Sequence, residues 1–392
     1  MDDAAARAEV TSPLKKVDTV VVGAGPAGLA VGACLQREGV PFVVLERAEA
    51  VGSRWRSHYD RLHLHTDKKR SALPHRPFPL GTPQYPSRQE VITYLEEYAH
   101  HFRLPIQFGQ EACAVRRREG AWETVTPTAR YRSRAVVVCT GHSNAPHVPD
   151  WPGRDEYEGE VLHSSRYRNA TPFAEQDVLV VGIGNSGAEI ALDLAEGGAR
   201  PTLAFRTPTN VVPRDVLGIP LLAVSRLSMK LPPRVADRLN APLLRLIFGD
   251  LTRYGLPKPE VGPMTQTREQ RRVPLIDVGT VDAIKRGAIA VKHAGVERFT
   301  RTGVRFSGGE EQDFSAVVLA TGYRPRVDAF LELPEEAQAP NGCPQVSGAE
   351  AAAPGLYFCA YHVSPGGMLG VIAEEAPGIA RAIAARQPEA AA

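Results

Sequence analysis

A glycine-rich turn between a strand-like run and a helix-like run occurs twice in this chain of 392 residues. In the later copy, the apolar, β-branched run 178–181 is typical of a buried parallel strand. It continues into Gly182-Ile-Gly184-Asn-Ser-Gly187 and then into a helical pattern. Strand, glycine turn and helix in this order predict a dinucleotide-binding unit, because glycines admit a pyrophosphate to the backbone and the helix N-terminus supplies N–H donors.

The strand that follows this helix ends in a basic residue. Residues 201–205 form the expected strand, and Arg206 stands 19 positions after Gly187. An acidic residue at this point would bind the ribose of NAD, whereas a guanidinium suits a 2′-phosphate. The later unit is therefore predicted to bind NADPH.

The earlier copy ends in an acidic residue instead. A strand over 17–22 leads into Gly23-Ala-Gly25-Pro-Ala-Gly28 and a helix, and the next strand, 42–45, ends at Glu46. A carboxylate there suits a ribose hydroxyl, as in the ADP half of FAD. A single glycine turn could be fortuitous in an ordinary α/β sheet, but two copies with opposite charges at the strand ends favour two cofactor sites.

Charge and cysteine usage exclude several classes of function. The 46 basic and 44 acidic residues nearly cancel, which argues against nucleic acid or an anionic membrane as the main partner. The five cysteines form no C-x-x-C pair, so neither a disulfide framework, a metal site nor a dithiol redox centre is expected. No apolar run reaches the ~18–20 residues of a transmembrane helix. Residues 1–16 lack the apolar core of a signal peptide and are predicted to be a disordered lead-in of a cytoplasmic protein.

The segment after Glu46 is irregular and carries candidate site residues. A glycine turn with Trp55 suits a loop against a flat cofactor, with a surface loop and a partly buried tryptophan as the alternative. Long irregular segments in compact domains are often functional. Leucine and histidine alternate over 62–65, so His65 is a candidate active-site residue, with a structural hydrogen bond as the alternative. An amphipathic helix over 89–102, capped by Ser87, is expected only to pack.

A β-meander and buried strand over 111–139 precede Thr140-Gly141, where backbone can approach a ligand above the sheet. The following proline-rich stretch marks a domain boundary near residue 150. Beyond it lies the pattern Tyr157-x-Gly159-x-x-x-His163-x-x-x-Tyr167, and later Leu319-Ala-Thr321-Gly322-Tyr323.

These motifs resemble the signatures of the flavin-containing monooxygenase family. The first is similar to F-x-G-x-x-x-H-x-x-x-F/W/Y, with Tyr157 in place of phenylalanine, and the second to F/L-A-T-G-Y. Gly52-Ser-Arg-Trp55 resembles G-G-x-W, with Ser53 in place of one glycine. The likeness covers residues 17–385.

Within that family the chain looks most like the plant indole-3-pyruvate monooxygenases of the YUCCA type. The likeness rests on residues 59–65, Tyr85-Pro-Ser, the stretch 216–262 and residues 273–279. It does not fix the substrate, because other monooxygenases can share these features.

A leucine-, arginine- and proline-rich insertion over about 216–256 interrupts the second unit. Its apolar face could form a lid over the substrate, a dimer contact or a weak membrane-surface helix. Core packing with a dimer contact is the favoured interpretation, because mixed charges disfavour a membrane.

The last strands and helix are expected to return to the first unit. A strand over 314–320 ends at Thr321-Gly322, another covers 356–360, and a glycine-preceded helix covers 371–385 and can present N–H donors to a flavin. The prediction is an α/β fold with two Rossmann-like domains: residues 17–150 and 311–392 bind FAD, and residues 151–310, inserted between them, bind NADPH.

The resemblance implies an NADPH-dependent flavin monooxygenase that forms a C4a-(hydro)peroxyflavin and oxygenates a small organic substrate with molecular oxygen. A 2-oxo acid, decarboxylated in the reaction, or an amine, N-hydroxylated, are the first candidates. Baeyer–Villiger or sulfide oxygenation, or an NADPH-flavin reductase serving a protein partner, are the alternatives.

No metal site, nucleic acid or membrane partner is expected, and a homodimer is a candidate assembly. His65 and Asn144 are the candidate catalytic residues, through hydrogen bonds near the flavin or nicotinamide. The residues expected to bind the cofactors are Gly23, Gly25, Pro26, Ala27, Gly28, Glu46, Arg47, Trp55, Leu62, Thr140, Gly141, Gly182, Gly184, Asn185, Ser186, Gly187, Arg206, Thr321, Gly322, Tyr323 and Leu369.

Overall fold

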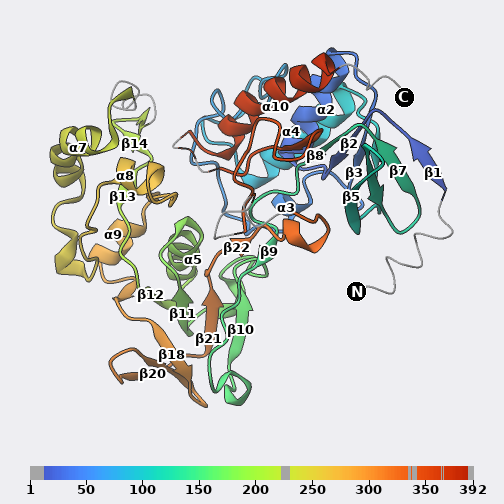
Figure 1. Cartoon of the computed structure of the whole chain (residues 1–392). Helices are drawn as coiled ribbons and strands as arrows, with labels where there is room; N and C mark the ends of the chain where they lie inside the picture. The colour runs from blue at the N-terminus through green and yellow to red at the C-terminus, as the bar shows by residue number, and fades with distance from the viewer. Residues whose placement is uncertain are drawn as a thin grey trace.

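A computed structural model describes residues 13–221, 230–333, 337, 342–362, 364 and 366–386 of the chain. The chain forms two lobes, each built on a five-stranded parallel sheet (Figure 1). Two side-by-side crossings join the lobes, where β9 (Ala145–Pro146) pairs antiparallel with β22 (Tyr323–Arg324). The predicted α/β architecture with two dinucleotide-binding units is confirmed.

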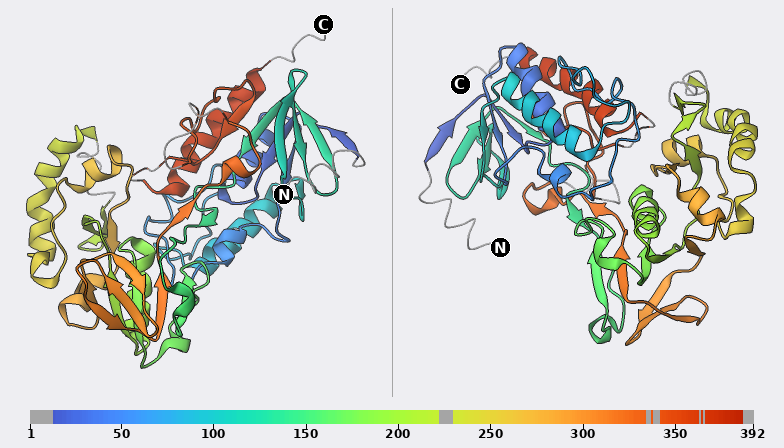
Figure 2. Two further views of the ribbon diagram at one scale, coloured as in Figure 1. Left: turned by 60° about the horizontal axis from the view of Figure 1, so that its bottom comes forward. Right: turned by 180° about the vertical axis from the view of Figure 1, so that it is seen from behind.

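The first sheet has the strand order β23-β8-β2-β3-β4. Its strands are β2 (Thr19–Val22), β3 (Phe42–Leu45), β4 (Ile106–Gln107), β8 (Ala135–Val138) and β23 (Leu356–Phe358). Helices α2 (Pro26–Arg37), α4 (Arg88–His101) and α10 (Met368–Ala385) cover one face, and the views in Figure 2 agree on this arrangement. The other face packs on an antiparallel meander of β5 (Ala114–Arg118), β6 (Ala121–Val125) and β7 (Arg130–Ser133).

Alternation along the strands produces these two faces, because successive side chains of a strand point to opposite sides. Val21 and Val137 belong to the core under the helices, while Val20 and Val136 belong to the core under the meander. The predicted helix over 89–102 is α4, and its Ser87 and Glu90 form a complete capping box.

The second sheet repeats this plan with the order β10-β21-β11-β12-β17. Its strands are β10 (Glu160–His163), β11 (Asp177–Val181), β12 (Arg200–Ala204), β17 (Ala290–Lys292) and β21 (Ala316–Leu319). Helices α5 (Asn185–Glu196) and α9 (Thr280–Lys285) share a core with one face. A second antiparallel meander covers the other face: β18 (Val296–Phe299), β19 (Gly303–Phe306) and β20 (Glu311–Asp313).

Two boundaries predicted from the sequence are wrong. The strand predicted over 314–320, assigned to the first domain, is β21, which pairs with β10 and β11 inside the second sheet. The second unit therefore extends past residue 311. Leu14–Lys16, predicted to be disordered, form β1, which pairs in parallel with β7. Residues 1–12 of the predicted lead-in lie outside the described residues, and the remaining division into two domains stays a proposal.

The insertion forms the upper left part of the second lobe in Figure 1. Strand β13 (Val211–Pro213) pairs with β16 (Leu275–Asp277), and β14 (Asp215–Val216) and β15 (Ile219–Pro220) form a hairpin. Helices α7 (Pro233–Phe248) and α8 (Pro263–Arg268) follow. Part of the predicted apolar helix face, from residue 222 to 229, lies outside the described residues. None of the helices described is both long and apolar enough to span a bilayer.

The remaining short elements are α3 (Ser53–Arg56), η1 (Arg154–Glu156), η2 (Thr171–Phe173), η4 (Leu251–Tyr254) and η5 (Val327–Ala329).

Candidate cofactor and substrate sites

The first glycine turn forms a cradle at the carboxyl end of the first sheet. A Cβ on Gly28 would lie 1.8 Å from the carbonyl oxygen of Gly23, so this glycine is required for the close approach of α2 to β2. A Cβ on Gly25 would meet no protein atom within 4 Å, and its φ of −76° suits any residue. The space above Gly25 is therefore available to a ligand, at the N-terminus of α2.

Glu46 stands at the end of the neighbouring strand and is held in place by backbone donors. It is 5% exposed, and its two carboxylate oxygens accept hydrogen bonds from Ala24 N at 2.7 Å and Ala48 N at 3.0 Å. A cavity of about 130 Å³ lies beside it. The predicted residues that line this cavity are Gly23, Gly25, Pro26, Glu46, Arg47, Trp55, Thr140 and Asn144.

The second glycine turn has the same geometry. A Cβ on Gly187 would lie 1.8 Å from the carbonyl oxygen of Gly182, while one on Gly184 would meet nothing within 4 Å. Arg206 follows β12 with an exposed side chain, and Gly295 makes room for it, since a Cβ there would lie 2.8 Å from Arg206 Cγ. Open space over the middle glycine and an exposed guanidinium fit a phosphorylated dinucleotide.

The motif around Gly159 joins the strands rather than facing a cavity. The Tyr157 hydroxyl donates to the carbonyl of Phe314 at 2.7 Å, and His163 Nε2 lies 3.0 Å from the carbonyl oxygen of Gly322. The Tyr167 hydroxyl donates to Asp193 at 2.6 Å. The first two contacts fix β10 against the segments on either side of β21, so they stabilise the crossing between the lobes.

Arg54, which was not among the site residues predicted from the sequence, contacts both segments that cross between the lobes. Its Nε donates to the carbonyl of Ser143 at 2.8 Å, and its guanidinium lies 4.5 Å from the ring centre of Tyr323. Thr321 also donates to the carbonyl of His147 across the crossings. Thr140 Oγ1 lies 2.7 Å from the hydroxyl of Tyr361, beside Gly141. The predicted residues 140–141 and 321–323 thus lie where the chain passes between the lobes.

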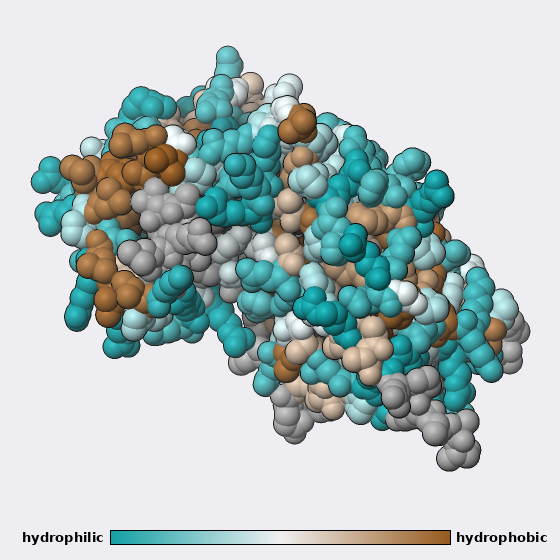
Figure 3. All heavy atoms as spheres, turned by 90° about the horizontal axis from the view of Figure 1, so that it is seen from above, coloured by the Kyte–Doolittle hydropathy of each residue, from teal (hydrophilic) through white to brown (hydrophobic). Residues whose placement is uncertain are grey.

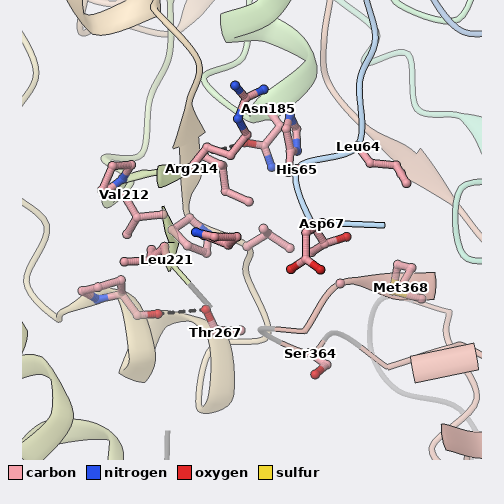
Figure 4. A pocket seen from close by; sticks show the side chains of 18 of the residues that line it. Leu64, His65, Asp67, Asn185, Val212, Arg214, Leu221, Thr267, Ser364 and Met368 are labelled. Atoms are coloured by element: carbon pink, nitrogen blue, oxygen red, sulfur yellow. Dashed lines mark hydrogen bonds between the residues drawn. The ribbon is translucent and has the colours of Figure 1, made fainter. Parts of the chain in front are cut away.

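A larger cavity, of about 370 Å³, lies between the lobes and is mostly apolar. Figure 4 shows Leu64, His65, Asp67 and Met368 of the first lobe around it, with Val212, Arg214, Leu221 and Thr267 of the second. Trp55 lines both cavities. Asn185 of the second glycine turn, Leu369 of α10, and Asn240, Leu243 and Leu244 of α7 also contribute.

The two candidate catalytic residues lie in different cavities. His65 lines the large cavity, and its Nε2 lies 2.6 Å from an oxygen of Glu189, a carboxylate on α5 that is only 3% exposed. Asn144 lines the smaller cavity, where it accepts a hydrogen bond from Arg47 at 3.2 Å and donates to the carbonyl of Pro325 at 3.2 Å. The structure therefore does not bring them together.

Burial and the Glu189 carboxylate raise the pKa of the neighbouring Tyr59 hydroxyl well above its ordinary value, so that tyrosine stays protonated. Ser186 also bonds this hydroxyl. Leu62 packs on the core of the second lobe. The roles predicted for Leu62 and Ser186 in cofactor binding remain predictions.

Comparison with known proteins identifies the family. The sequence profile of the pyridine nucleotide-disulphide oxidoreductases matches residues 20–217. An indole-3-pyruvate monooxygenase, YUCCA1 of rice (Oryza sativa subsp. japonica), is 41% identical over 80% of this chain and 78% of its own. The chain belongs to the pyridine nucleotide-disulphide oxidoreductase family, and within that family to the flavin monooxygenases. The predicted enzyme class is thereby confirmed.

Solved structures of flavin monooxygenases have the same fold. A double mutant of the flavin monooxygenase from Stenotrophomonas maltophilia aligns with a TM-score of 0.73 and 26% identity, over 95% of this chain and 99% of that one. The complex of OTEMO with FAD and NADP aligns with a TM-score of 0.72 at 18% identity, over 95% and 86% of the two chains. The flavin monooxygenase class agrees with the predicted flavin, and the OTEMO structure is a protein of this fold that contains both FAD and NADP.

The family name does not imply a disulfide centre in this flavin monooxygenase. All five cysteines lie within the described residues and are free. The described part of the chain also holds no cluster of three or more metal-ligating side chains.

Proposed function

We propose that this flavin monooxygenase binds FAD on the first glycine turn and NADPH on the second, and oxygenates a small organic molecule in the large cavity between them. One observation carries this proposal: the cavity wall contains Asn185 of the second glycine turn and Trp55, which also lines the cavity at the first turn. A substrate held there would touch residues of both cofactor sites.

The chain's own residues support each assignment. Gly25 and Glu46 would receive the pyrophosphate and ribose of FAD, and Gly184 and Arg206 would receive the pyrophosphate and 2′-phosphate of NADPH. When bound, the flavin supplies the transfer of electrons from NADPH to oxygen and the oxygenation chemistry. The protein must hold the substrate and exclude water, and the apolar wall of the cavity suits that task.

The substrate proposed first is a 2-oxo acid with an apolar body, in line with the indole-3-pyruvate named for the plant relatives. The reaction balances as 2-oxo acid, oxygen, NADPH and one proton giving the shortened carboxylic acid, carbon dioxide, water and NADP⁺. N-hydroxylation of an amine is the second candidate. His65, fixed by Glu189, would donate or accept a hydrogen bond at the polar end of the cavity.

We also infer that the enzyme works in the cytoplasm. Its five free cysteines, three of them buried, suit a reducing compartment, where disulfides are rare.

Product identification tests the function. The purified yellow protein would be incubated with NADPH and a 2-oxo acid, an amine, a sulfide or a ketone, and oxygen uptake and products would be followed by electrode and mass spectrometry. Oxygen uptake that depends on the 2-oxo acid, together with a product one carbon shorter, supports the proposal. NADPH oxidation that no substrate accelerates, with electrons passing only to a protein acceptor, would contradict it.

A further inference from the structure

The wall of the large cavity carries one arginine, Arg214, among mainly apolar side chains (Figure 4). The other acidic or basic side chains of the wall either have a protein partner or are neutral. Asp67 is 5% exposed, pairs with Arg70 and accepts backbone hydrogen bonds from residues 69 and 70. Burial lowers the pKa of His142, which is therefore neutral at pH 7, and His65 contacts Glu189.

Arg214 is held from behind by two side chains. Its Nε donates to Asp215 Oδ2 at 3.1 Å, and its guanidinium carbon lies 4.2 Å from the ring centre of Tyr85. The Tyr85 hydroxyl donates to the other carboxylate oxygen of Asp215. The backbone is equally fixed, because Arg214 lies between β13 and the β14–β15 hairpin and its carbonyl accepts from Leu221 N at 3.0 Å.

This arrangement leaves one edge of the guanidinium to a ligand. Among the described residues, only Asp215 accepts a hydrogen bond from the side chain of Arg214, and it uses Nε. The two Nη groups can thus form the paired hydrogen bonds that a carboxylate accepts. Stacking and the Asp215 bond have already restricted the side chain, so little conformational entropy is lost when an anion binds.

We propose that Arg214 binds the carboxylate of the substrate, so that the enzyme selects apolar 2-oxo acids over amines. This inference rests on the proposed function and decides between its two substrate classes. An ammonium group beside the guanidinium would be repelled. A neutral ketone or sulfide has no anionic group to accept the paired hydrogen bonds of the two Nη groups, so it gains no affinity from the guanidinium.

The test compares two substrates that differ only at the anionic group, phenylpyruvate and phenylacetone. In Arg214→Gln, the dissociation constant of phenylpyruvate, measured by titration of the flavin absorbance of the holoenzyme, should rise about 10–100-fold. That of phenylacetone should stay within about twofold, because it has no carboxylate to lose. In Arg214→Lys the dissociation constant of phenylpyruvate should lie between those of wild type and Arg214→Gln, because lysine keeps the charge but lacks the planar guanidinium.

Arg245→Gln is the matched control, because Arg245 is exposed on α7 and does not line the cavity. Flavin content should be unchanged in all variants, and in Arg245→Gln the rate of flavin reduction by NADPH and both dissociation constants should match those of wild type. Equal changes for the acid and the ketone, or none for the acid, would overturn the role of Arg214. Failure of the proposed function has a different signature: wild type would oxygenate no 2-oxo acid, even where phenylpyruvate binding depends on Arg214.

Discussion

Gly25 and Gly28 occur in one motif, but the structure gives them separate tasks. In Gly28→Ala the new Cβ would meet the Gly23 carbonyl oxygen at 1.8 Å, so we expect a loss of stability of about 1–3 kcal/mol or more. In Gly25→Ala the new Cβ meets no protein atom, so the protein should fold normally and lose affinity for FAD. Melting temperature and the ratio of flavin to protein absorbance separate the two effects. A Gly25→Ala protein with normal FAD affinity would show that no pyrophosphate occupies this space.

Arg206 makes a similar distinction between the two nicotinamide cofactors. A hydrogen bond to a charged group contributes roughly 1.5–3 kcal/mol, or about 10–100-fold in affinity. Arg206→Ala should weaken NADPH binding by about that factor and leave NADH nearly unaffected, because NADH lacks the 2′-phosphate. Stopped-flow measurement of flavin reduction with both nucleotides gives the answer. An unchanged preference for NADPH would mean that Arg206 is only a solvated surface residue.

Among the elements, local pattern predicted the strands and helices of both glycine units, because periodicity and glycine positions report short-range structure. Strand β3 has the predicted bounds, and α4 begins at its predicted cap. Local pattern could not predict to which of the two sheets β21 belongs. An apolar run such as Ala316–Leu319 fits the interior of any parallel sheet, and only its pairing with β10 and β11 assigns it. The same holds for Arg214, whose place in the cavity depends on β13 and a distant tyrosine.

His58, in the loop after α3, is protonated less readily in the folded protein than in the unfolded chain. Burial, followed by the charges of Arg54, Arg88 and Arg168, lowers the pKa of His58 from 6.5 to about 4. The unfolded chain therefore binds a proton more readily than the folded one, and stability falls as the pH drops from about 6.5 towards 4. The upper limit of this loss is about 3 kcal/mol.

We expect His58→Gln to lose less stability than wild type between pH 7.5 and pH 4.5 in urea unfolding, because glutamine has no proton to bind. His101→Gln, at an exposed position on α4, is the control and should follow wild type. A His58→Gln protein whose stability falls as steeply as that of wild type would show that His58 is not the group responsible.

In the whole molecule, two lobes that repeat one plan meet at a cavity to which both contribute. Each glycine turn could be predicted from its own segment, but the cavity could not, because its lining combines residues as distant as Leu64, Arg214 and Met368. Helix α7 completes it from the outside with Leu243 and Leu244. This supports a role for the insertion in shaping the substrate site, beside whatever its outer face does.

That outer face is apolar, and it carries the last prediction. Val235, Leu239 and Leu246 share one side of α7 and are 43%, 63% and 83% exposed. Figure 3 shows apolar residues gathered over this end of the molecule. Exposed apolar patches commonly mark interfaces. We expect it to form the contact of a homodimer, since Asp250 close to the arginines of α7 makes an anionic membrane a poorer match.

The double variant Leu239→Asp with Leu246→Asp should then be monomeric in sedimentation velocity at concentrations where wild type is a dimer, with the dimer dissociation constant raised more than about tenfold, because each aspartate would be buried without a partner. Leu80→Asp, at a fully exposed position in the first lobe, is the control and should leave the dimer intact. A wild-type monomer that co-sediments with anionic vesicles at physiological salt would instead assign this face to a membrane surface. A double variant that remains dimeric would place the dimer contact elsewhere on the molecule.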